Sequence, residues 1–138
     1  MIGYSGTPLV KKLGIKPGTR LLVVGDVPDE YQSWLGPLPD RATISGRGKP
    51  PHPAVHVFVT KREELVRHLE HLRKALAPDG YVWVSWPKKA SKVPTSITED
   101  VIREVALPLR FVDIKVCAVS EVWSGLKLVI RVAERSKL

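Results

Sequence analysis

Runs of apolar residues indicate where the strands of this chain lie. The segments 20–24, 55–59 and 81–86 are almost continuously apolar and rich in β-branched or aromatic residues. That pattern is typical of strands that are covered on both faces of a sheet. A shorter run at 42–45 predicts a further, brief strand, and the segment 46–53 between them, rich in glycine and proline, predicts a loop.

The end of the chain has a different pattern. Segments 111–119 and 126–132 alternate between apolar and polar residues, as strands with one solvated face do. Trp123-Ser124-Gly125 lies between them and reads as a turn. We therefore expect an antiparallel hairpin here.

One segment shows strong helical periodicity. In residues 61–77 the apolar side chains recur at helical spacing, and Thr60 with Glu63 has the spacing of a capping box. A shorter helix is expected at 29–35, before the break at Gly36-Pro37-Leu38-Pro39. The periodic leucines of the longer helix are Leu65, Leu69, Leu72 and Leu76.

Capping signals predict two more helices. Thr7 is expected to be the N-cap of a short helix over 9–13. Ser96 and Glu99 form a second capping-box pair, at the start of a helix that Pro108 ends.

The order of these elements predicts the fold class. A helix over 61–77 between strands 55–59 and 81–86 makes a right-handed crossover, so the two strands run parallel in one sheet. We predict a single Rossmann-like α/β domain over residues 1–138, with three layers, a mostly parallel sheet and a C-terminal antiparallel hairpin.

Composition narrows the class of protein. The 138 residues carry a formal net charge of +8, which attracts polyanions without selecting among them. The single Cys117 has no thiol partner, and no apolar run is long enough for a spanning helix, so we expect no disulfide, no metal site and a cytoplasmic protein without membrane attachment. One Met, one Cys and 12 Pro favour a thermophilic source and a high melting temperature.

Two resemblances follow from particular residues. The helix end and strand start from Leu72 to Trp86 resemble those of class I methyltransferases, in a truncated form. The stretches Gly3–Leu9, Trp86–Ser91, Ile97–Asp100 and Trp123–Leu126 are similar to a family of small bacterial proteins catalogued as a domain of unknown function. The resemblance implies a methyltransferase-like fold that lacks one strand and one helix, and no particular activity.

The cofactor motif of methyltransferases is incomplete in this sequence. The loop after the first strand keeps Gly25 but then places Pro28, which removes an N–H donor. Where methyltransferases carry an acidic residue after the second strand, this chain has Ser45-Gly46-Arg47. We therefore expect no cofactor, although S-adenosylmethionine is the one that the fold would take.

The candidate site lies at the carboxyl ends of the parallel strands, where such sheets bind ligands. Lysines after the fourth strand would hold the phosphates of a nucleotide or nucleic acid while Trp86 stacks on a base. The plainer interpretation is a solvated basic loop beside a core tryptophan. The candidate ligand-binding residues are Gly25, Asp26, Thr60, Lys61, Trp86, Lys88, Lys89 and Lys92.

Three functions remain open at this point. The first is a non-catalytic module that binds an anionic ligand through this basic rim. The second is a small enzyme that uses S-adenosylmethionine or a nucleotide-like substrate, around Asp26. The third is a protein-interaction subunit, either with another protein or as a homo-oligomer. The sequence predicts no catalytic residue, because no nucleophile has a base beside it in a recognisable motif.

Overall fold

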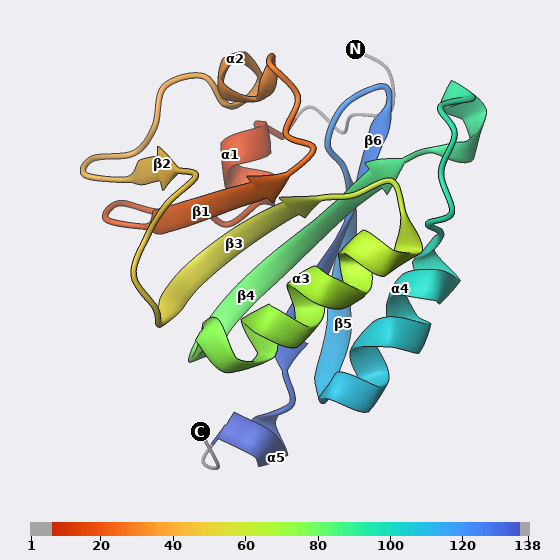
Figure 1. Cartoon of the computed structure of the whole chain (residues 1–138). Helices are drawn as coiled ribbons and strands as arrows, with labels where there is room; N and C mark the ends of the chain where they lie inside the picture. Colours follow the sequence, from red (N-terminus) through yellow and green to blue (C-terminus); the bar gives the residue numbers. More distant parts are fainter. Residues whose placement is uncertain (1–6, 136–138) are drawn as a thin grey trace.

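The computed structural model describes residues 7–135, which form one six-stranded sheet with helices on both faces (Figure 1). The strand order is β2-β1-β3-β4-β6-β5. Strands β2, β1, β3 and β4 run parallel, whereas β6 is antiparallel to both β4 and β5. The predicted mostly parallel α/β sheet with an antiparallel C-terminal hairpin is confirmed. The Gly3–Gly6 part of the resemblance lies outside the described residues.

The strands cover the predicted apolar runs, but one prediction about Leu76 was wrong. This leucine was expected in the helix over 61–77, whereas its backbone is extended and it pairs with His52 in the sheet. The strands are β1 (Arg20–Gly25), β2 (Thr43–Ser45), β3 (His52–Phe58), β4 (Leu76–Pro87), β5 (Phe111–Ala118) and β6 (Trp123–Ile130). The helices are α1 (Leu9–Lys12), α2 (Tyr31–Leu35), α3 (Arg62–Ala75), α4 (Glu99–Ala106) and α5 (Val132–Arg135), with 3₁₀ turns η1 (Lys89–Ser91) and η2 (Leu107–Leu109). Within residues 7–135 no helix is both long and apolar enough to cross a membrane.

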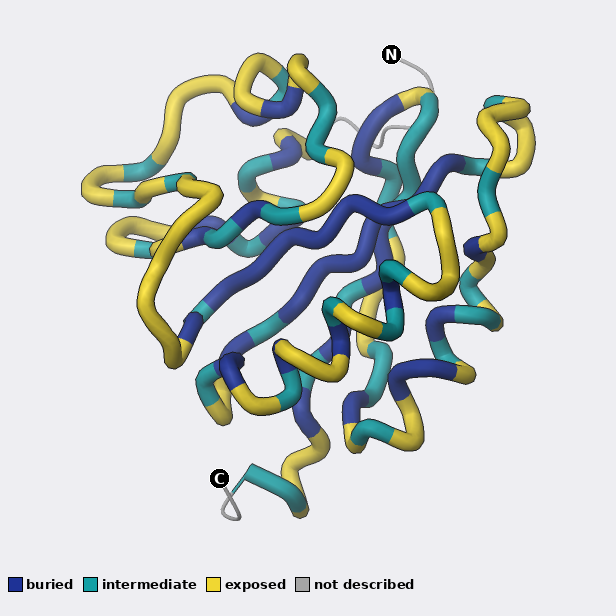
Figure 2. Tube along the Cα trace, in the orientation of Figure 1, coloured by how far each residue is buried: buried dark blue, intermediate teal, exposed yellow. Residues whose placement is uncertain are grey.

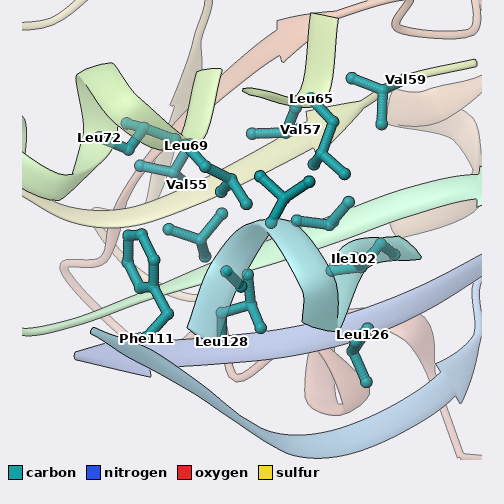
Figure 3. Close-up of a cluster of buried hydrophobic side chains, with 14 of the residues drawn as sticks. Val55, Val57, Val59, Leu65, Leu69, Leu72, Ile102, Phe111, Leu126 and Leu128 are labelled. Atoms are coloured by element: carbon teal, nitrogen blue, oxygen red, sulfur yellow. The ribbon is translucent and has the colours of Figure 1, made fainter. Parts of the chain in front are cut away.

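Alternate residues of the central strands fill two separate cores. On one face Val55 and Val57 of β3 pack with the leucines of α3 and with Ile102 of α4 (Figure 3). On the other face Phe58 and Trp83 pack with residues of α1 and α2. Because both faces are covered, the central strands are buried along most of their length (Figure 2).

The helix caps differ from the predicted ones. Pro8, not Thr7, is the N-cap of α1, and Lys61 is the N-cap of α3 without a side-chain bond. The Ser96 hydroxyl lies at the start of α3 instead, where it accepts a hydrogen bond from the Arg62 N–H at 2.8 Å. Thr98 takes the role predicted for Ser96 and accepts from the Val101 N–H at the start of α4. Capping residues can therefore come from a neighbouring loop, which local spacing does not reveal.

The hairpin turn also lies elsewhere. Trp123-Ser124-Gly125 is the start of β6, and the turn is at 119–122. Ser120 forms that turn, because its hydroxyl accepts from the N–H groups of Val122 and Trp123. A Cβ at Gly125 would lie 3.2 Å from the Trp83 ring, so this glycine reflects close packing in the sheet rather than a turn.

Candidate functional site

The carboxyl ends of β1 and β3 form the switch point of the sheet. After β1 the chain moves to β2 on one side, and after β2 it returns to β3 on the other side. Connections that leave a sheet in opposite directions open a crevice between the two strand ends, where ligands of such folds bind. Gly25 and Asp26 follow from β1 at this point, and Thr60 and Lys61 follow from β3.

Gly25 allows the two strand ends to approach closely. Its φ is +92°, and a Cβ built on it would lie 2.1 Å from the Phe58 carbonyl oxygen. The next residue, Asp26, donates its N–H to that same oxygen at 2.8 Å. No other residue type fits here without moving β3, and the Asp26 carboxylate is left exposed at the edge of the sheet.

Thr60 is anchored by the loop that precedes α4. Its carbonyl oxygen accepts from the Thr95 hydroxyl at 2.7 Å and from the Ser96 N–H at 3.0 Å. Together with the bond from Arg62 to Ser96, these contacts fix the start of α3 beside the switch point. The Lys61 side chain is exposed there.

Glu64 is a site residue that the sequence analysis missed. Its Oε1 atom is buried without a hydrogen-bond partner, which is costly unless a ligand or water completes the site. Burial lowers the pKa of His68, one turn further along α3, while the charges of Glu64 and Asp26 act in the opposite direction. Asp26, Glu64 and His68 therefore lie close enough to interact, and the four-residue spacing of Glu64 and His68 on one helix was the available signal.

The structure separates Trp86 from the lysines that follow it. Trp86 is 7% exposed and belongs to the core under α3 and α4, so the predicted stacking on a base was wrong. Lys88 is half-buried, and its N–H bonds the Val122 carbonyl at 2.7 Å. Lys89 and Lys92 are exposed around η1. Strand β4 is next to β3, so this basic turn lies further along the same edge of the sheet.

Three buried polar side chains form a hydrogen-bonded series next to the candidate site. His56 of β3 is fully buried; its Nδ1 lies 2.7 Å from the Tyr31 hydroxyl and its Nε2 lies 2.7 Å from the Ser85 hydroxyl. Burial lowers the pKa of His56 to about 3 and raises that of Tyr31. These hydrogen bonds join α2 to β3 and β4. They therefore hold α2, which follows Asp26 in the sequence, on the sheet.

The described residues contain no cluster of three or more His, Cys, Asp or Glu side chains able to hold a metal ion. The four histidines divide between two faces: His56 lies among the residues of the α1 and α2 core, whereas His52, His68 and His71 line a cavity on the α3 side. Cys117 is half-buried, and burial raises the pKa of its thiol, which disfavours the reactive thiolate.

Comparison with known proteins identifies the fold. No family model matches the chain, and no curated protein matches it either. Among solved structures it is similar to an S-adenosylmethionine-dependent methyltransferase from Aquifex aeolicus, with a TM-score of 0.64 and 16% identity over 88% of each chain. It is also similar to the Aeropyrum pernix fibrillarin, with a TM-score of 0.58 and 15% identity over 92% of this chain and 70% of that one. A methyltransferase from Pyrococcus furiosus gives a TM-score of 0.56 at 14% identity, over 90% of this chain and 80% of that one.

The chain thus has the Rossmann-like fold of class I methyltransferases, in a truncated form, as the resemblance implied. These matches also correct the expectation that no cofactor is used. The fibrillarin with this fold holds natively bound S-adenosyl-L-methionine. An incomplete glycine motif was therefore too weak a reason to exclude that cofactor.

Proposed function

We propose that this protein is an enzyme that binds S-adenosylmethionine at the switch point between β1 and β3 and uses it as a methyl donor. The observation that carries the proposal is the buried, unpartnered carboxylate oxygen of Glu64, in the first turn of α3 after the carboxyl end of β3, in a methyltransferase fold. A carboxylate in that state is an acceptor prepared for a ligand that brings hydroxyl or ammonium donors. The ribose and the amino group of S-adenosylmethionine are such donors.

The residues of the crevice suit this cofactor in three respects. Gly25 puts no side chain at the end of β1, and its backbone is exposed. Asp26 and Glu64 supply carboxylates, which replace the acidic residue that is missing after β2. Lys61 places an ammonium group at the same edge, where it would pair with the carboxylate of the methionine part.

When bound, S-adenosylmethionine supplies an electrophilic methyl group on a sulfonium ion. The chain's own residues bind and orient it: Glu64 and Asp26 accept hydrogen bonds, and Lys61 donates. The anchored loop at Thr95 and Ser96 keeps the start of α3 in position while this happens. Preorganised contacts of this kind are what align a methyl group with an incoming nucleophile.

Isothermal titration calorimetry tests the proposal, with S-adenosylmethionine and S-adenosylhomocysteine as ligands. Wild-type protein should bind both, and Glu64→Gln should weaken binding about tenfold or more, because a charged acceptor is lost. The matched control is Glu63→Gln, an exposed carboxylate one residue earlier on the same helix, which should bind as wild type does. Absence of binding to wild type, or equal effects of the two substitutions, would refute the proposal.

The basic turn after β4 supports a second role, the binding of a nucleotide or nucleic acid. Within residues 7–135, Lys88, Lys89 and Lys92 form no ion pair with a carboxylate. Unpaired lysines at a strand end that adjoins the crevice would hold a polyanionic substrate. Lys88→Glu combined with Lys89→Glu should abolish binding of a single-stranded oligonucleotide in a filter-binding assay. Unchanged affinity would remove this turn from the substrate site.

A further inference from the structure

The cavity lined by His52, His68 and His71 lies on the α3 face of the sheet, between α3 and the loop that joins β2 to β3. It has a volume of about 330 Å³, with Leu22 and Val24 of β1 and Leu72 of α3 as its apolar lining. That volume is within the range of small-molecule sites. In Figure 1 the loop returns from the end of β2 along the edge of the sheet to the start of β3.

The cavity exists because no helix covers this part of the sheet. Strand β2 is only three residues long, and the exposed loop 46–51 follows it directly. On the α3 side, Leu22 and Val24 therefore remain half-buried while the equivalent Val55 and Val57 of β3 are fully covered. The missing strand and helix of the truncated fold leave an open, partly apolar floor.

The polar walls of the cavity consist of an arginine and three histidine side chains. Arg47 comes from the loop, His52 from β3, and His68 and His71 from α3. A smaller cavity of about 90 Å³ shares Arg47 and His52 and adds Arg20 and Lys49. Side chains from four separate segments thus gather around these two cavities, and none of the described residues that line them is a carboxylate.

The arginine and lysine side chains around the two cavities have no carboxylate partner in the part of the chain that the structure describes. Among residues 7–135, Arg20, Arg47 and Lys49 make no ion pair. His52 is 6% exposed, and its pKa is lowered by burial and by the nearby His71 and Arg20. The negative charges of Asp26 and Glu64 act to raise the pKa of His68, against the effect of its burial. The cavities thus bring arginine and lysine side chains without an ion pair next to imidazoles that can donate N–H groups, an arrangement that suits an anionic ligand.

We propose that this cavity is a phosphate-binding site, for a phosphoryl group carried by a small molecule or by a nucleic acid backbone. The Arg47 and Arg20 guanidinium groups give charge-assisted hydrogen bonds, which suit phosphate oxygens. The imidazoles of His52, His68 and His71 donate N–H groups from the opposite wall. None of Gly25, Asp26, Thr60 or Glu64 lines this cavity, so phosphate binding can be tested apart from S-adenosylmethionine binding, although the two sites adjoin at His68.

The test uses the four histidines as probes. Their imidazole C–H resonances are followed by NMR while inorganic phosphate, pyrophosphate or a single-stranded oligonucleotide is added. The signals of His52, His68 and His71 should move together, whereas His56, buried on the other side of the sheet, should not. No movement with any of the three probes, or equal movement of His56, would overturn the proposal.

Two variants make the test specific. Arg47 and His71 are exposed, so Arg47→Gln and His71→Gln should leave the fold intact, and each should weaken binding of the best probe about tenfold. Arg131→Gln, which removes an exposed charge after β6, is the control and should leave affinity unchanged. Tightest binding of pyrophosphate indicates a small phosphorylated ligand, and tightest binding of the oligonucleotide indicates a nucleic acid. Equal loss in Arg131→Gln and Arg47→Gln would show general attraction to a basic protein and refute the site.

Discussion

Acid should destabilise this protein through one buried side chain, His56. The imidazole is fully buried between the hydroxyls of Tyr31 and Ser85, and its pKa is about 3 in the folded chain. The unfolded value is about 6.5. Above pH 6.5 both states hold a neutral imidazole, so His56 has no effect on the pH dependence there.

Below pH 6.5 the unfolded chain binds a proton at His56 and the folded chain does not. The free energy of unfolding therefore falls as the pH falls, by about 1.4 kcal/mol per pH unit, until the folded pKa is reached. From pH 7 to pH 5 this amounts to about 2 kcal/mol from His56 alone. His52 and His68, whose pKa values are also lowered, add to the effect in the same direction.

Urea denaturation at pH 7 and pH 5 isolates the contribution of His56. His56→Gln keeps an amide near Tyr31 and Ser85 but does not titrate. This variant should be less stable at pH 7, yet it should lose about 2 kcal/mol less than wild type on going to pH 5. His71→Gln, at an exposed position of α3, should retain most of the wild-type loss. If His56→Gln loses as much stability as wild type, the burial argument is refuted.

Three other predictions concern stability. Gly25→Ala should lower the free energy of unfolding by about 3 kcal/mol or more, because it combines a positive φ with a clash against the Phe58 carbonyl. Chemical denaturation measures this loss, and a value under about 1 kcal/mol would contradict the geometry. Ser96→Ala should cost about 1 kcal/mol, since the Arg62 N–H at the start of α3 loses its acceptor, and an unchanged midpoint would refute that cap. The scarcity of Met and Cys and the 12 prolines predict thermal unfolding above the usual mesophilic range of about 45–65 °C in a calorimetric scan, and a midpoint near 50 °C would contradict it.

The parts of the fold that the sequence revealed are those with strong local patterns. Strand β3 and the second half of β4 are buried on both faces, so each is a continuous apolar run, and the leucines of α3 repeat at helical spacing. The caps and the hairpin turn could not be read in the same way. Ser96 bonds a helix 34 residues away in the chain, and Gly125 is small because Trp83 packs against it.

The candidate site was only partly foreseeable for the same reason. Strand order placed Gly25, Asp26, Thr60 and Lys61 at one edge, because each lies at or shortly after the carboxyl end of a parallel strand. Trp86 follows the same rule, yet the alternation of β4 turns it into the core. The buried state of Glu64 depends on how α3 packs on the sheet, which no local pattern encodes.

The same limit applies to the phosphate site. His52, His68 and His71 have no common spacing in the sequence, and they meet only because α3 runs back along β3. Their clustering also depends on the loop 46–51, which stands where the full methyltransferase fold has a further strand and helix.

A crystal structure of the protein saturated with S-adenosylhomocysteine tests the central claim most directly. The account predicts the ligand at the carboxyl ends of β1 and β3, over Gly25, with a donor of the ligand bonded to the Glu64 Oε1 atom that now has no partner. Ligand density away from Gly25 and Glu64, or none in crystals grown at saturating ligand, would contradict it.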